Sequence, residues 1–223
     1  KASISWLRSP LPKNDFARKY DSADYAGALA SWRATPWQPV SSLDHAMLAH
    51  VLALGGDEAA TPYIEALRPW EPVEADALSG VLLSRKGDFA GAGTLLASAL
   101  TRYREDPWPL LSIMQTAITT AAETARDPRS ADKVLDALAQ PYAAYLLENP
   151  RGRAYLAAAW EARKCGTATL TALREYEPNV PWNASVLQMR VICYGAAGLQ
   201  AQAAKAQEDL REFSEGELQA LAP

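Results

Sequence analysis

Residues 80–100, GVLLSRKGDFAGAGTLLASAL, carry the pattern from which the architecture can be inferred. The Gly-Asp pair at 87–88 separates two segments rich in Leu and Ala, and such a pair typically interrupts a helix. Alanine makes up roughly one residue in five of the whole chain, and runs of β-branched residues are few. This composition favours helix over strand. The stretch therefore predicts two helices joined by a turn, and the chain as a whole is predicted to be all-α.

The same interruption recurs along the chain as two alternating series of helix breakers. One series consists of the prolines Pro36, Pro69, Pro107, Pro150 and Pro181. The other consists of short turns at residues 22–24, 55–57, 87–88, 126–128, 166–167 and 198. Because the two series interleave, they divide the chain into blocks that each have the length of a helix. Six antiparallel helical hairpins are predicted.

The two ends of the chain are expected to differ from the repeats. A Ser-Pro-Leu-Pro run predicts an extended lead-in over residues 1–13, and residues 14–223 are expected to form a single helical-repeat domain. Ser214 and Glu217 have the spacing of a capping box, which predicts a short C-terminal helix that covers the last hairpin. The chain begins with Lys rather than Met, which favours a fragment or a mature form.

Four of the five prolines are followed directly by tryptophan. An aromatic residue just ahead of a helix can act as a hydrophobic staple that fixes the angle at which the chain enters it. We therefore expect these side chains to pack between successive repeats; the alternative is that some of them line a ligand surface. They are Trp37, Trp70, Trp108 and Trp182.

Charge and hydropathy narrow the range of partners. The chain has 22 Lys and Arg against 26 Asp and Glu, a net charge of −4, so no overall positive field attracts nucleic acid or anionic lipid. Its apolar stretches fall far short of the ~20 residues that a membrane span requires. The sequence predicts a soluble chain that neither binds nucleic acid nor inserts into a membrane. Two cysteines fit the cytosol and the periplasm equally well, so the compartment stays open.

The residues that usually carry metal or nucleophilic chemistry are scarce. The only histidines, His45 and His50, are five positions apart, which puts them on different faces of a helix, and both are expected at or near the surface. The only cysteines, Cys165 and Cys193, are expected to be ordinary packing residues without a disulfide. No glycine-rich phosphate-binding motif is present, and the carboxylates are scattered. We therefore predict no catalytic residue, no metal and no cofactor.

The third hairpin resembles a tetratricopeptide repeat (TPR) at Gly80, Leu83, Gly87, Asp88, Phe89, Ala92, Ala99 and Leu100. In that family a small residue sits where the two helices cross, so the resemblance implies that Gly80 and Ala92 face each other. Weaker copies follow in the other hairpins, except in the fourth. The resemblance implies a divergent, right-handed TPR-like α-solenoid, for which the main structural rival is a fragment of an (α/α) toroid.

The resemblance also implies where a partner binds, because in TPR proteins the first helices of the hairpins line a concave groove that commonly holds a peptide. Carrying the family register over gives the groove candidates Arg85, Arg153, Trp160, Arg163, Lys164 and Gln188. The fifth hairpin combines an aromatic side chain with three cations, which suits an acidic or aromatic peptide. The competing interpretation is that Trp160 packs against the sixth hairpin and the cations only solvate the helix.

These features predict a non-catalytic interaction module that acts as a scaffold or adaptor. Such a module could also be an appendage domain of a larger protein. The alternative is a helical glycan-binding or glycan-processing protein, in which Trp and Tyr platforms stack on sugar rings and two carboxylates perform acid and base catalysis. The seven tryptophans motivate this alternative. A carboxylate pair roughly 5–9.5 Å apart in an aromatic cleft would distinguish it.

Overall fold

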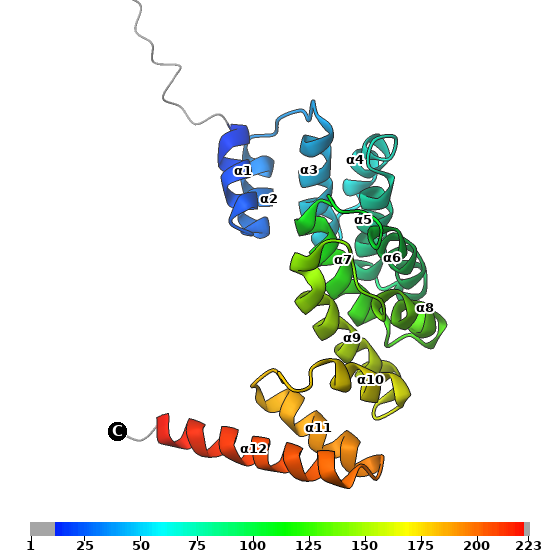
Figure 1. Cartoon of the computed structure of the whole chain (residues 1–223). Coiled ribbons are helices and arrows are strands. Elements are labelled where there is room, and N and C mark those ends of the chain that lie inside the picture. The colour runs from blue at the N-terminus through cyan, green and yellow to red at the C-terminus, as the bar shows by residue number, and fades with distance from the viewer. Residues whose placement is uncertain (1–11, 221–223) are drawn as a thin grey trace, which may run out of the picture.

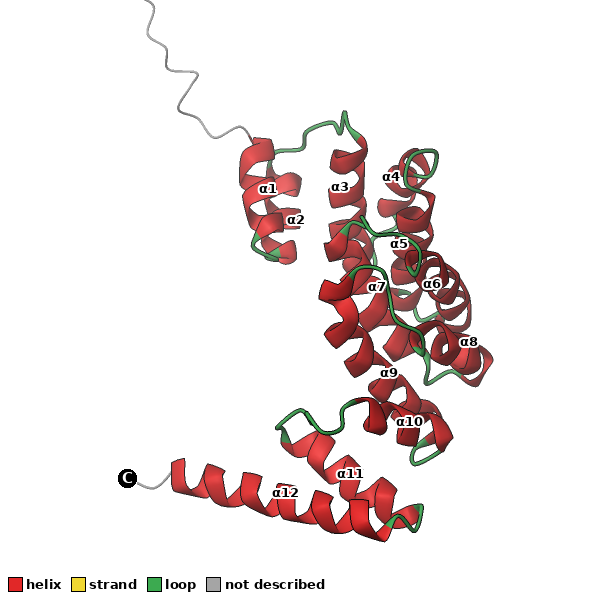
Figure 2. Ribbon diagram, in the orientation of Figure 1, coloured by secondary structure: helices red, strands yellow, loops and turns green. Residues whose placement is uncertain are grey.

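The computed structural model describes residues 12–220 (Figure 1). In this range the chain is all-helical and has no strand (Figure 2), as the sequence predicts. The elements are α1 (Pro12–Asp21), α2 (Tyr25–Ala34), α3 (Ser42–Leu54), α4 (Ala60–Leu67), α5 (Pro72–Arg85), α6 (Phe89–Tyr103), α7 (Leu111–Thr124), α8 (Pro128–Leu138), the 3-10 turn η2 (Tyr145–Leu147), α9 (Glu148–Arg163), α10 (Thr167–Glu175), α11 (Ala184–Ala196) and α12 (Gln200–Ala220).

The predicted turns fall at the junctions between helices, although Pro128 and Thr167 are already the first residues of α8 and α10. Asp24 and Asp88 end two of these turns, and their carboxylates accept hydrogen bonds from the backbone N–H groups of Gly27 and Gly91 in the first turns of α2 and α6. Such caps satisfy N–H groups that have no partner within the helix. Gly87 has a φ of +85°, a left-handed conformation that favours glycine. The breakers therefore act through the backbone of their own segment.

Consecutive helices pack in pairs, from α1 with α2 to α11 with α12. Beyond these pairs, α3, α5, α7 and α9 contact one another in order, and α6 contacts α8. In Figure 1 the pairs succeed one another from α1–α2 at one end to α11–α12 at the other, with α4, α6 and α8 to the right of α3 and α7. Helices α7 and α9 consequently lie side by side, and α11 follows at the end of the row, in contact with α10 and α12.

The crossing of α5 and α6 depends on Gly80. A Cβ atom at this position would lie 2.7 Å from Cγ of Leu96 and 3.3 Å from the carbonyl oxygen of Ala92. Both of these neighbours are completely buried, so they have little room to move away. The close approach of residues 80 and 92 that the sequence predicts is therefore present.

The predictions for the two ends need correction. Helix α1 already begins at Pro12, so the extended lead-in cannot reach residue 13, and residues 1–11 lie outside the described part. Ser214 lies inside the continuous helix α12, where its hydroxyl donates to the carbonyl oxygen of Leu210. A serine can bond in this way to the preceding turn as well as cap a helix, and no breaker precedes it here. No separate capping helix therefore begins at Ser214.

The prediction that the tryptophans after proline pack between repeats is wrong for three of the four. Trp70, Trp108 and Trp182 are 74%, 88% and 54% exposed. Only Trp37 packs inward, with its ring 5.4 Å from that of Phe16. The prolines end the preceding helices early and leave the following residue in a loop that faces solvent.

The sequence predicts His50 at or near the surface, and this prediction is wrong. The side chain is completely buried. Its Nδ1 lies 2.8 Å from the hydroxyl of Tyr20 on α1, and its Nε2 lies 2.8 Å from the hydroxyl of Thr116 on α7. The Tyr20 hydroxyl also lies 2.9 Å from that of Ser112. Burial lowers the pKa of His50 to about 4. This network ties the first helix pair to α7.

Candidate interaction groove

The exposed faces of α7 and α9 border a depression of about 450 Å³. Helix α7 contributes Gln115, Thr119 and Glu123, which are four residues apart and therefore share one face. Helix α9 contributes Arg153, Ala157 and Glu161 with the same spacing. The helical period thus places two polar stripes opposite each other, and we call the space between them the α7–α9 depression.

A second, smaller depression of about 210 Å³ lies between α9 and α11. Its lining consists of Trp160 from α9 and of Ser185, Gln188, Met189 and Ile192 from α11, and we call it the Trp160 pocket. The ammonium group of Lys164 lies 5.1 Å from the centroid of the Trp160 ring, close enough for a cation–π contact. The pocket therefore has an apolar floor and a positively charged rim.

The α7–α9 depression is lined by two cations, Arg126 and Arg153, and by two carboxylates, whereas no charged side chain lines the Trp160 pocket. Among the described residues, Arg153 and Lys164 are exposed and neither forms an ion pair. No carboxylate lines the Trp160 pocket, and of the two that line the α7–α9 depression, Glu123 is paired with Arg85 while Glu161 makes no ion pair within the described residues. Arg153 at the α7–α9 depression and Lys164 beside the Trp160 pocket can each bind a carboxylate of an incoming chain.

The structure brings most of the six predicted groove residues to this surface. Trp160 and Gln188 meet in the Trp160 pocket, with Lys164 at its rim. Arg153 lines the α7–α9 depression, and Arg85, at the end of α5, reaches the same wall through its ion pair with Glu123 at 3.2 Å.

Arg163, also predicted as a groove residue, lines neither depression. Its guanidinium lies 2.7 Å from the carboxylate of Asp132 on α8. Helix α8 packs on the side of α6, away from α11. Helix α9 ends at Arg163, and Lys164 follows it with a φ of +50°, so the backbone turns between the two residues.

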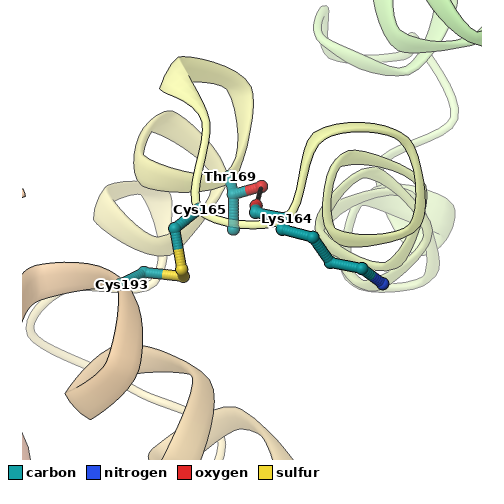
Figure 3. Close-up of a disulfide and its surroundings, with 4 residues drawn as sticks. All are labelled: Lys164, Cys165, Thr169 and Cys193. Carbon is teal, nitrogen blue, oxygen red and sulfur yellow. Dashed lines mark hydrogen bonds between the residues drawn. A yellow bond between two sulfur atoms is a disulfide. The ribbon is translucent and has the colours of Figure 1, made fainter. Parts of the chain in front are cut away.

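The sequence also missed a covalent link, because Cys165 and Cys193 form a disulfide (Figure 3). Their Cα atoms are 4.8 Å apart, within the range that a disulfide spans. Cys165 follows the end of α9, and Cys193 lies in α11, 28 residues further on. Nothing in the spacing of two cysteines signals such a contact, since it depends on how the hairpins pack.

A buried ionic cluster holds the last hairpin together. Arg190 is only 1% exposed, and its guanidinium lies 2.7 Å from Asp209 on α12 and 2.7 Å from Glu177 in the loop before α11. Burial raises the pKa of Asp209, but hydrogen bonds from Arg190 and Lys205 outweigh it, so the net direction is down. The charges of this cluster neutralise one another, and their ion pairs connect α11 to α12 and to the loop before α11.

Exposed apolar side chains gather at a third place, where the loop before α7 meets the loop before α9. Trp108, Leu111, Tyr145 and Leu146 are 88%, 42%, 84% and 77% exposed and border one depression of about 290 Å³. Contiguous exposed apolar side chains commonly mark interaction sites. The Pro-Trp-Pro sequence at 107–109 is the sequence signal for this patch, although the Pro-Trp pair by itself favours packing between helices.

Comparisons of the chain with models of protein families, with curated proteins and with solved structures find no match. Within residues 12–220, no helix is both long and apolar enough to cross a bilayer. In the same range no three His, Cys, Asp or Glu side chains gather as a metal ion would require. The groove is therefore interpreted from its own geometry.

Proposed function

We propose that the chain is a divergent TPR-like solenoid that acts as a protein–protein interaction module. Its support is the combination of paired helices with serial contacts among α3, α5, α7 and α9 and the close crossing at Gly80. Stacked hairpins of this kind present the faces of their first helices as a continuous binding surface. On this proposal the right-handed superhelix places α7, α9 and α11 along one concave wall.

The proposed partner is a peptide segment that combines apolar side chains with carboxylates. The Trp160 pocket offers an apolar floor, and Arg153 and Lys164 offer two cations that make no ion pair within the described residues. An aromatic side chain beside cations is typical of the positions that contribute most to binding. The single observation that carries the proposal is that Trp160 and Gln188, on separate hairpins, line one pocket.

A display selection tests this proposal. A random dodecapeptide library is selected against the full, disulfide-bonded chain, and the enriched peptides are synthesised and measured by isothermal titration calorimetry. We expect enrichment of apolar residues next to Asp or Glu. Arg153→Glu and Ile192→Ser should each weaken binding about tenfold or more, which corresponds to at least about 1.4 kcal/mol.

Lys133→Glu is the matched control, because Lys133 is an exposed cation on α8, outside both depressions. This variant should bind the selected peptides with unchanged affinity. If no peptide is enriched, or if all three variants bind equally well, the groove is not the binding surface. Circular dichroism confirms that each variant is folded.

The glycan-binding alternative is favoured by one observation, the exposure of Trp108 and Tyr145 beside each other in the third depression. Such rings can stack on sugar faces. No carboxylate lines this depression, so the geometry offers a platform without the acid and base of a glycosidase. A glycan array tests it: binding that disappears in Trp108→Ala and persists in Ile192→Ser would favour this alternative.

A further inference from the structure

The disulfide joins the two walls of the Trp160 pocket. Cys165 directly follows Lys164, the cation at the rim, and Cys193 directly follows Ile192, which lines the pocket. Figure 3 shows the sulfur bridge between these two segments, with the Lys164 side chain extending away from it. The buried hydroxyl of Thr169 donates to the carbonyl oxygen of Lys164 and so fixes the backbone beside Cys165. The bridge thus sets the distance between the rim and the opposite wall.

Few other contacts hold α11 against the preceding hairpin. Helix α11 packs along the length of α12, whereas it meets the fifth pair over a much smaller area, at α10 and around Trp160 of α9. The loop of residues 176–183 connects the end of α10 to the start of α11, and Arg190 is bound to Glu177 in this loop. Cys193 lies nine residues into α11, about 14 Å along the helix from its start. The last hairpin is therefore fastened at two separated points, the loop and the disulfide.

We propose that the Cys165–Cys193 disulfide is a latch that keeps the Trp160 pocket closed, and that the closed pocket receives an apolar side chain of the partner next to a carboxylate. The inference rests on the interaction function proposed above. The choice of occupant follows from charge complementarity: the carboxylate faces Lys164 and the apolar group lies between Trp160 and Ile192. With the latch open, α11 loses its covalent attachment to the fifth pair, its helix loosens, and the two walls separate.

A dithiol opens the latch in two exchange steps. One of its thiolates attacks Sγ of Cys165, which is half-buried, rather than that of the completely buried Cys193. The S–S bond breaks, a mixed disulfide forms at Cys165, and Cys193 leaves as a thiolate that takes up a proton. The second thiolate of the dithiol then attacks its own sulfur in the mixed disulfide, and Cys165 leaves in the same way. The chain gains two electrons and two protons, and the dithiol becomes a disulfide.

Amide hydrogen exchange tests the latch without any partner. The full chain is compared in its oxidised form and after reduction with dithiothreitol. We expect the amides of α11 to exchange about tenfold or more faster after reduction, while those of α5 stay unchanged as an internal control. Cys165→Ala with Cys193→Ala should reproduce the reduced pattern and be insensitive to dithiothreitol. Unchanged exchange in α11 would overturn the latch.

Peptide binding tests the occupant. The probe is the dodecapeptide selected above, and its affinity for the reduced chain should be about tenfold weaker than for the oxidised chain. Replacing the peptide carboxylate by an amide should weaken binding to the wild type but not to Lys164→Gln. A peptide that depends on Ile192 yet binds both redox forms equally overturns the latch and leaves the proposed function intact. If no selected peptide depends on Ile192 while α11 still loosens on reduction, the pocket is not the docking site and the proposed function fails.

Discussion

The hydroxyl of Tyr20 lies 2.8 Å from Nδ1 of His50, although the two residues belong to different helix pairs. His50 in turn reaches Thr116 on α7 through Nε2. Each ring nitrogen thus has a hydroxyl partner that can either donate or accept, so a neutral ring is satisfied on both sides. Burial favours this neutral imidazole, because it penalises the charged form and lowers the pKa of His50.

The buried imidazole predicts that the chain loses stability on mild acidification. The pKa of His50 is lowered by burial to about 4, while the unfolded chain has the ordinary value near 6.5. The unfolded state consequently binds the proton first, so the stabilisation is complete above pH 6.5 and is lost as the pH falls toward 4. Between pH 7 and pH 5 the free energy of unfolding should decrease by about 2 kcal/mol through this group.

Urea unfolding of the wild type and of His50→Gln at several pH values measures this effect. The variant should be less stable at pH 7 but should show a smaller decrease between pH 7 and pH 5. His45→Gln is the control, because His45 is only half-buried and lies outside the network. A decrease of the same size in wild type and His50→Gln would assign the pH dependence to other groups.

The crossing of α5 and α6 predicts opposite effects for two glycine substitutions. Gly80→Ala places a methyl group 2.7 Å from Cγ of the buried Leu96 and should destabilise the chain by about 1–3 kcal/mol. Gly195→Ala lies in α11 with no atom within 4 Å of the new methyl group, and should stabilise by about 0.5–1 kcal/mol through helix propensity. Denaturant midpoints measure both, and equal shifts in the same direction would contradict the close crossing.

Trp37 and Trp108 both follow a proline, but they should contribute very differently to the free energy of unfolding. Trp108 is 88% exposed, so Trp108→Ser should change the free energy of unfolding by less than about 0.5 kcal/mol. Trp37 packs edge-on against Phe16, and Lys13 lies 5.6 Å from its ring centroid, so Trp37→Ser should cost about 2–3 kcal/mol. Thermal unfolding followed by circular dichroism compares the two variants. A large loss in Trp108→Ser would show that this side chain is packed in solution.

The last hairpin should depend on its buried cation. Arg190→Met leaves Asp209, which is 7% exposed, with Lys205 as its remaining partner, and should lower the free energy of unfolding by about 3 kcal/mol. Lys205→Met removes the other, exposed partner of the same carboxylate and should cost less than about 1 kcal/mol. Hydrogen exchange in α12 locates the effect. If Lys205→Met were the more damaging change, the buried pair would not be the main joint.

Local sequence signals determined the helices and their turns. Asp24, Gly87 and Asp88 act on the backbone of their own segment, through caps and a left-handed φ, so their effect can be predicted without knowledge of packing. The groove positions on α9 and α11 came from the register that the TPR resemblance implies, and Trp160 and Gln188 line one pocket. That register does not account for the ion pair of Arg163, because its partner Asp132 belongs to another hairpin.

Only the tertiary structure decided the contacts and the burial of residues whose partners are remote in sequence. The Cys165–Cys193 bond and the burial of His50 depend on how whole hairpins approach one another, and neither spacing nor composition encodes that distance. The exposure of Trp108 is decided in the same way, because a proline fixes where a helix ends but not whether the next residue meets a neighbour or water. A helix and its turn are determined by interactions within a few residues of sequence. Contacts between hairpins depend instead on how all the helices pack against one another.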